Sequence, residues 1–185
     1  MRQACFDRLS TNGVKMSDNI EVMWEGRFIT AKREGKWEYV SRSRGIKAAV
    51  ILAIDDGHVL LVEQYRVPPG RNCIELPAGL VGDHDENAEE DSAIAAIREL
   101  EEETGYRAET MENCGEYYSS PGMVSESFSL FKARELTKVS DGGGVDGENI
   151  IVHRIALSGL TDFMESKRSE GAGIDVKLLM FLQLV

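Results

Sequence analysis

The residues of this sequence best suited to chemistry are the carboxylates between Asp83 and Glu103. That stretch holds ten acidic residues and a single basic one, Arg98. On a helix of about 100° per residue, Glu99 and Glu103 lie four apart on one stripe, with Glu102 beside them. Like charges at this spacing destabilise a helix, so another interaction has to offset the repulsion.

Two interpretations of the acidic stripe stay open on the residues alone. It could be the solvated face of a Glu-rich helix, or its carboxylate oxygens could bind a hard cation such as Mg²⁺ or Mn²⁺. Arg98 favours the cation site, because it lies four residues before Glu102 and can pair with that carboxylate and fix its orientation. Gly105 then ends the helix at the expected C-terminal position.

The string RELEEETGY, from Arg98 to Tyr106, resembles the signature of the Nudix hydrolase superfamily, R-E-U-x-E-E-x-G-U, where U is bulky and apolar. Glu90 stands eight residues before Arg98, as that signature requires, and Gly79 in LPAGL resembles its opening glycine. The sequence departs from the pattern between Gly79 and Glu90, where ten residues stand in place of about five. We interpret the difference as an insertion of about five residues near 82–86.

Strings outside the signature resemble the ADP-ribose pyrophosphatase and nucleoside diphosphate sugar hydrolase branch. They are WEYVSR, VEQYR, ELPAGL and SSPG, and they extend the resemblance from about Trp37 to the C-terminus. Pro121 follows Tyr106 by fifteen residues, the spacing at which members that hydrolyse ADP-ribose carry a proline. The resemblance implies metal-dependent hydrolysis of ADP-ribose to AMP and ribose 5-phosphate. GDP-mannose, UDP-glucose and NADH are alternative substrates, because the signature handles only the diphosphate.

The resemblance also implies which residues hold Mg²⁺ (or Mn²⁺). The matching groups are the side chains of Glu99, Glu102 and Glu103 and the backbone carbonyl of Ala78. A further carboxylate ligand comes from a later loop in such enzymes, and the match there is Glu148.

The same loop supplies the general base in similar enzymes. Asp146 and Glu148 are both candidates here, and an Asp is one methylene shorter, which matters when a base must reach its water within hydrogen-bond distance. Arg98 and Glu102 complete the implied catalytic set.

Five residues match substrate-binding positions of that branch. The resemblance implies that Trp37 stacks on adenine, that Glu38 hydrogen-bonds the base, and that Arg42 lies near the phosphates. Arg66 matches a further arginine that contacts substrate, and Pro121 is the proline described above. Members of the branch form homodimers in which the N-terminal strands help to build the partner's pocket, which implies a homodimer here.

The hydrophobic pattern predicts the strands that position these residues. EVMWEGRFIT and KWEYVSR alternate around the turn AKREG and predict an N-terminal antiparallel hairpin. IKAAVILAI and HVLLVEQYR, joined by a turn at Asp55–Gly57, predict two core strands. Another strand pair is expected near 112–119 and 125–133, followed by a strand at IIVHRIAL.

The acidic stretch predicts a helix from about Glu89, and LTDFMESKRSE and IDVKLLMFLQLV predict two more. Between these elements, DGGGVDG (Asp141–Gly147) has the composition of a mobile loop. The order of strands and helices predicts an α+β chain, and with the resemblance a Nudix-type α/β/α sandwich with a mixed central sheet.

Length and composition bound what remains. The chain has 185 residues and 42% hydrophobic residues, enough for one domain with a packed core. We expect a disordered extension at 1–18, strands for dimerisation and substrate binding at 19–44, and the Nudix hydrolase domain at 45–185.

Charge, hydropathy and cysteine usage exclude several partners. The net charge of −11 argues against a nucleic-acid partner, and no apolar run is long enough to span a membrane. Three widely spaced cysteines favour a reduced, cytoplasmic location. A small nucleoside diphosphate is the expected partner instead. A non-hydrolysing binding module on the same fold is the alternative of another class, but the complete set of carboxylates argues against it.

Overall fold

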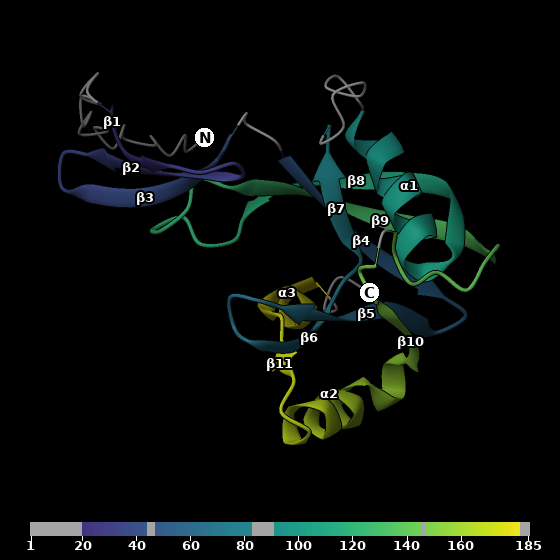
Figure 1. Ribbon diagram of the computed structural model, residues 1–185. Helices are drawn as coiled ribbons and strands as arrows, with labels where there is room; N and C mark the ends of the chain where they lie inside the picture. The colour runs from purple at the N-terminus through teal and green to yellow at the C-terminus, as the bar shows by residue number, and fades with distance from the viewer. Residues whose placement is uncertain (1–19, 44–46, 83–90, 146, 182–185) are drawn as a thin grey trace, which may run out of the picture.

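The computed structural model describes residues 20–43, 47–82, 91–145 and 147–181 (Figure 1). A small sheet formed by the first strands projects from one end of a body in which α1 and α2 lie on opposite sides of the strands. Several predicted features lie outside the described residues: the extension at 1–18, Glu90 and Asp146. Of the insertion near 82–86, the structure describes Gly82 alone. No helix in the described ranges is long and apolar enough to cross a membrane.

The small sheet is antiparallel and has the order β1 (Ile20–Glu25), β2 (Ile29–Glu34) and β3 (Trp37–Arg42). The predicted two-stranded hairpin was therefore incomplete, because EVMWEGRFIT itself folds back at Gly26, whose N–H donates to the carbonyl of Ile29 at 2.9 Å. The free edge of β3 pairs with the segment before β9. Val40 donates its N–H to the carbonyl of Met123 and accepts one from Ser125.

The larger sheet consists of two halves that share one hairpin. One half is mixed and contains β7 (Ala78–Val81), β4 (Lys47–Asp55), β9 (Ser127–Lys138) and β8 (Tyr106–Tyr118), in that order, with β4 and β9 parallel. The other half contains β10 (Ile151–Ala156), β5 (His58–Arg66), β6 (Arg71–Glu75) and β11 (Gly173–Ile174).

The turn between β4 and β5 joins the two halves, and its prediction is confirmed. Asp55 pairs with His58, so the turn has two central residues, Asp56 and Gly57, with φ of 45° and 67°. Positive φ at both positions matches the right-handed twist of the flanking strands.

Alternation along β4 builds a core on both of its faces. Ala49, Ile51 and Ala53 pack against α1 (Ser92–Thr104), where small side chains let the helix lie close to the sheet. Val50 and Leu52 point the other way, into a second core. Leu160 of α2 (Leu160–Ser169) and Leu178 of α3 (Val176–Phe181) complete that second core. The expected α+β sandwich with a mixed sheet is confirmed.

Several elements differ in extent from the prediction. α1 begins at Ser92, after the carboxylate of Asp91 accepts the N–H of Ala93 at 2.8 Å and caps the helix. β8 begins directly after α1 and is longer than expected, as is β9, because the two strands pair along almost their full lengths. The predicted α3 is described as far as Phe181.

Candidate active site

The C-terminal half of α1 brings the carboxylates to the sheet. The helix ends at Gly105, whose φ of 75° allows its N–H to donate to the carbonyl of Glu101 at 2.9 Å. Glu103 faces inward and is only 6% exposed. Its Oε2 accepts the backbone N–H of Ala78, at the start of β7, at 3.0 Å.

The Glu103 carboxyl is buried, and the positive charge of Arg66 is not enough to balance the cost of burying its charged form. Burial raises the pKa of Glu103 to about 8, and although the N–H of Ala78 lowers it, the carboxylates of Glu99 and Glu148 raise it further and Arg66 opposes them only weakly. Without a bound cation this carboxyl therefore carries a proton near neutral pH. A divalent cation would replace that proton and restore the charge.

Glu99, Glu103 and Glu148 line one cleft of about 420 Å³. Gly79 makes room for Glu99, since a Cβ at Gly79 would lie 1.9 Å from the Glu99 carboxyl carbon. Any other residue at position 79 would displace this side chain, which explains the glycine in LPAGL in physical terms.

The loop that carries Glu148 is anchored on the end of α1. Gly143 donates its N–H to the carbonyl of Glu103 at 2.9 Å, and Gly144 donates to the carbonyl of Glu102 at 3.0 Å. The Oε2 of Glu148 accepts the N–H of Val145 at 3.0 Å. The described part of DGGGVDG is thus tied to α1, because its N–H groups satisfy carbonyls that the helix end leaves open.

Arg98 orients two of the carboxylates. Its Nη1 lies 2.9 Å from Glu99 Oε1 and 3.1 Å from Glu102 Oε2. The predicted i,i+4 pair is thus present, and it extends to Glu99. Glu102 itself is absent from the lining of the cleft, so the helix presents two of its three acids to that space.

The oxygen atoms around the cleft suit a hard cation. Two carboxylates from α1, one from the 139–149 loop and the backbone of Ala78 border the same space, which matches the donor set of Mg²⁺ or Mn²⁺. Among the residues that the structure describes, no three acidic, histidine or cysteine side chains already stand at metal-ligand spacing.

Two arginines border the cleft, each held by a carboxylate. Arg66 donates from Nε and Nη2 to the two oxygens of Glu75, at 2.7 and 3.1 Å. Arg42 forms an ion pair with Glu126 through Nε. Both arginines therefore border the same cleft as Glu99, Glu103 and Glu148, so its lining offers cations as well as carboxylates.

Trp37 and Pro121 lie together at a different place. With Tyr39 they line a slot of about 200 Å³ between the small sheet and the segment before β9. Glu38 is exposed and borders neither the slot nor the cleft. Asp146 is outside the described residues, so only Glu148 of the two candidate bases is placed.

Sequence reasoning missed several cleft residues, which are Gln64, Glu75, Ser119, Glu126, Phe128 and Lys177. Lys177 carries the clearest overlooked signal, because it is a cation within the otherwise apolar segment VKLLMF. Its Nζ pairs with Asp175 and lies 5.9 Å from the ring centroid of Phe128.

Comparisons with known proteins agree with this geometry. The NUDIX domain family matches residues 44–153, which include α1, the cleft strands and Glu148. The chain is 34% identical to an ADP-ribose pyrophosphatase of Bacillus subtilis over 120 residues, 64% of this chain and 62% of that one. It is 31% identical to a GDP-mannose pyrophosphatase of Cronobacter sakazakii over 180 residues, 91% of this chain and 89% of that one.

A solved structure of an ADP compounds hydrolase has the same fold. It superposes with a TM-score of 0.63 at 23% identity and covers 80% of each chain. Since the family match spans more than half of the sequence and includes the complete RELEEETG string, the chain belongs to the Nudix family and is a Nudix hydrolase.

Proposed function

We propose that this protein hydrolyses the diphosphate bond of a nucleoside diphosphate linked to a second group, with ADP-ribose as the leading substrate and Mg²⁺ or Mn²⁺ as cofactor. The observation that carries the proposal is the cleft in which Glu99, Glu103 and Glu148 meet two arginines. Products from ADP-ribose would be AMP and ribose 5-phosphate.

The chemical difficulty is attack by water on a polyanion. A divalent cation supplies charge neutralisation at the phosphate oxygens and a lower pKa for bound water. Glu99, Glu103 and the carbonyl of Ala78 would hold it, and Glu148 lines the same cleft. Arg66, fixed by its two hydrogen bonds to Glu75, neutralises and orients the diphosphate.

Glu148 is positioned to take the proton from the attacking water. Its carboxylate lines the cleft, and the N–H of Val145 holds one of its oxygens. Asp146 stays an alternative base, and separate Glu148→Gln and Asp146→Asn variants distinguish them, because removal of the base lowers kcat without raising KM.

The slot at Trp37 supports a nucleotide substrate. Trp37 is 61% exposed, and with Tyr39 and Pro121 it offers a flat surface against which a purine can stack. The two named relatives act, by their names, on ADP-ribose and on GDP-mannose, both of which join a purine nucleoside diphosphate to a sugar. GDP-mannose is the second candidate, because that relative matches 91% of this chain.

A homodimer is part of the proposal. The small sheet exposes large apolar side chains that a monomer leaves in water, among them Met23 at 52%, Trp24 at 57% and Phe28 at 65% exposure. Burying them against a second copy removes this apolar area from solvent.

A panel of substrates assayed with millimolar Mg²⁺ tests the activity. Purified protein is incubated with ADP-ribose, GDP-mannose, UDP-glucose and NADH, and the nucleoside monophosphate is quantified by chromatography. We expect AMP from ADP-ribose at the highest kcat/KM, and at least about 100-fold slower release from Glu103→Gln. A higher kcat/KM for GDP-mannose would make GDP-mannose the substrate in place of ADP-ribose. Absence of hydrolysis with all four compounds would reject the proposal.

A further inference from the structure

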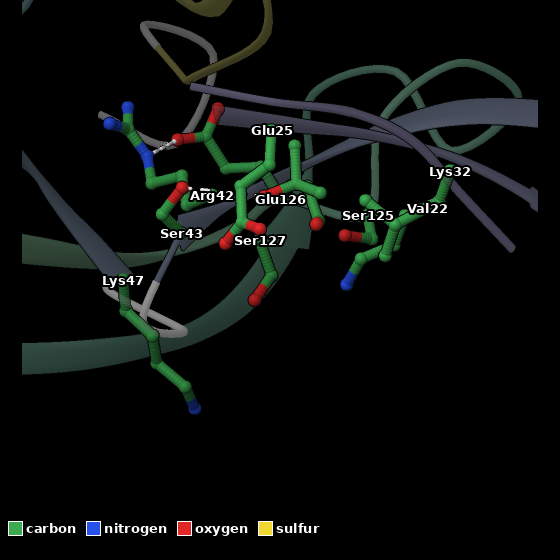
Figure 2. A pocket seen from close by; sticks show the side chains of 11 residues that line it. Val22, Glu25, Lys32, Arg42, Ser43, Lys47, Ser125, Glu126 and Ser127 are labelled. Atoms are coloured by element: carbon green, nitrogen blue, oxygen red, sulfur yellow. Dashed lines mark hydrogen bonds and ion pairs between the residues drawn. The ribbon is translucent and has the colours of Figure 1, made fainter. Parts of the chain in front are cut away.

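A second hollow, of about 640 Å³, lies between the small sheet and the start of β9 (Figure 2). It is separate from the carboxylate cleft but adjoins it, since Arg42 and Glu126 border both spaces. Figure 2 shows Arg42 and its partner Glu126 at one end, and Lys32 and Val22 at the other. The lining comprises Val22, Glu25, Thr30, Lys32, Ser41, Arg42, Ser43, Lys47, Ser125, Glu126 and Ser127.

Ser41 is a buried residue of this hollow whose side chain has no hydrogen-bond partner among the described residues. Its side chain is buried, with 8% of the residue exposed, and its Oγ makes no hydrogen bond within the structure. A buried hydroxyl without a partner destabilises a protein, so such groups usually serve a ligand or an ordered water. Neighbouring Ser43, by contrast, already donates to the carbonyl of Gly26 at 3.3 Å.

The chemistry of the lining fits a sugar. Five of its side chains carry hydroxyl groups, and these stand among carboxylates and cations, so both donors and acceptors are offered. The acids Glu25 and Glu126 offset most of the positive charge of Lys32, Arg42 and Lys47, so the hollow suits an uncharged polar ring better than a polyanion. No aromatic ring borders the hollow, which makes it a poor site for a base.

The hollow adjoins both the slot at Trp37 and the carboxylate cleft. Trp37 and Tyr39 of the slot lie on the same face of the small sheet as Ser41, because alternate residues of β3 share a face. Ser125 borders both the slot and the hollow. The hollow therefore adjoins the cleft proposed for the diphosphate, where a sugar joined to a phosphate would stand.

We propose that this hollow binds a sugar ring of the substrate and that Ser41 Oγ hydrogen-bonds one of its hydroxyls. The inference rests on the function proposed above and extends it from the diphosphate to the adjoining sugar.

The test is Ser41→Ala, assayed with the best substrate of the panel and two analogues. One analogue is the 2′,3′-dideoxynucleoside form, and the other replaces the sugar beyond the diphosphate by a methyl ester. Ser169→Ala is the matched control, because it removes a serine hydroxyl that donates to the carbonyl of Glu165 on α2, outside the three spaces. Ser41→Val, which replaces the hydroxyl with two methyl groups on the same wall, is the second variant.

We expect Ser41→Ala to raise KM about fivefold to tenfold with kcat little changed, the loss expected for one hydrogen bond. Its Tm without substrate should equal or exceed that of the wild type, since an unsatisfied buried hydroxyl is removed. Loss of this KM effect with the dideoxy analogue assigns the ribose. Loss with the methyl ester assigns the other sugar.

An equal KM effect on all three substrates, or none on any, would overturn the assignment of the hollow while leaving the proposed hydrolysis in place. Absence of hydrolysis in the wild type would overturn both. The Tm of each variant reports whether its own change in KM comes from misfolding, because a folded variant still shows a cooperative unfolding transition near or above the wild-type Tm.

Discussion

At the scale of single residues, the site depends on how one carboxyl is buried. The spacing of Glu99 and Glu103 is visible in the sequence, and so is the pairing of Arg98 with Glu102. The burial of Glu103 is not visible in the sequence. It depends on packing against β7, whose Ala78 lies 25 residues away in sequence and donates its N–H to the Glu103 carboxylate. The same holds for Lys177, which only the fold brings to the cleft.

We expect Glu103→Gln to lower kcat by at least about 100-fold, since it removes a charged ligand from the cleft. The fold should persist with an unchanged or higher Tm without metal, because Gln mimics the protonated carboxyl. Thermal unfolding with and without Mn²⁺ checks this, and the gain from metal should disappear in the variant.

Glu101→Gln is the matched control. It lies on the same helix but pairs outward with Arg107 at 2.8 Å. Wild-type turnover of Glu103→Gln, or an equal loss in Glu101→Gln, would contradict the assignment of Glu103 to the metal.

The raised pKa of Glu103 predicts a pH-dependent affinity for metal. Its neutral form suits the metal-free fold, so the stability from this group is full below its ordinary pKa of 4.5 and declines as pH rises towards about 8. A cation competes with the proton, and its affinity should therefore rise with pH up to about 8 and then level off. Titration calorimetry with Mn²⁺ from pH 6 to 9 would show this, and a flat profile would argue against it.

At the scale of elements, glycines decide how the 139–149 loop meets α1. Composition alone predicted mobility for DGGGVDG, because glycine-rich segments are flexible unless tertiary contacts hold them. Those contacts are long-range hydrogen bonds to the last carbonyls of α1, which no local pattern reveals. A run of three glycines was nevertheless a signal for close backbone approach.

We expect Gly142→Ala to displace the loop and Glu148 with it. Its Cβ would lie 2.4 Å from the carbonyl carbon of Thr104, and its φ is 65°. kcat should fall about tenfold to 100-fold, and Tm should drop. Gly171→Ala is the control, since it has a φ of 95° but no atom within 4 Å of the added Cβ. Equal kcat in the two variants would show that the loop does not position the base.

A second element-scale feature fixes α2 to the sheet. Glu63 on β5 is 7% exposed and accepts hydrogen bonds from Asn72 and His153, both at 2.9 Å, and an ion pair from Lys167 of α2 at 3.0 Å. Burial alone raises the pKa of Glu63, but these partners together lower it to about 2. The charged form therefore stabilises the fold above pH 4.5, and this stability is lost as pH falls towards 2.

We expect Glu63→Gln to lower the free energy of unfolding by about 1–3 kcal/mol at pH 7, with the difference shrinking below pH 4. Turnover should change little, because Gln64, not Glu63, faces the cleft. Urea unfolding at pH 7 and pH 3 measures the effect, with the exposed Glu165→Gln on α2 as control. A difference that grows at low pH would refute this account.

At the scale of the whole molecule, the sequence pattern predicted the layered α+β body well and the small sheet less well. Strand alternation and the Asp56–Gly57 turn are local signals, and both reappear in the structure. The third N-terminal strand was missed because alternation continues through Gly26, where the chain reverses. The pairing of β3 with residues 123–125 depends on the complete fold.

The exposed apolar side chains of the small sheet lead to a prediction about assembly. We expect sedimentation equilibrium to show a dimer, and Met23→Glu with Phe28→Glu to shift it to monomer by placing charge in the buried patch. Val67→Glu, at an apolar residue that is 79% exposed on the turn between β5 and β6, is the control and should stay dimeric. A monomeric wild type at micromolar concentration would contradict the proposal.

The backbone pairing of Val40 with Met123 and Ser125 has a consequence for protein engineering. It ties the slot residues of β3 to the segment that carries Pro121, so the two walls of the slot form one structural unit, apart from α1 and its acids. Exchanging both walls between relatives should transplant the choice of base while the hydrolytic machinery stays intact.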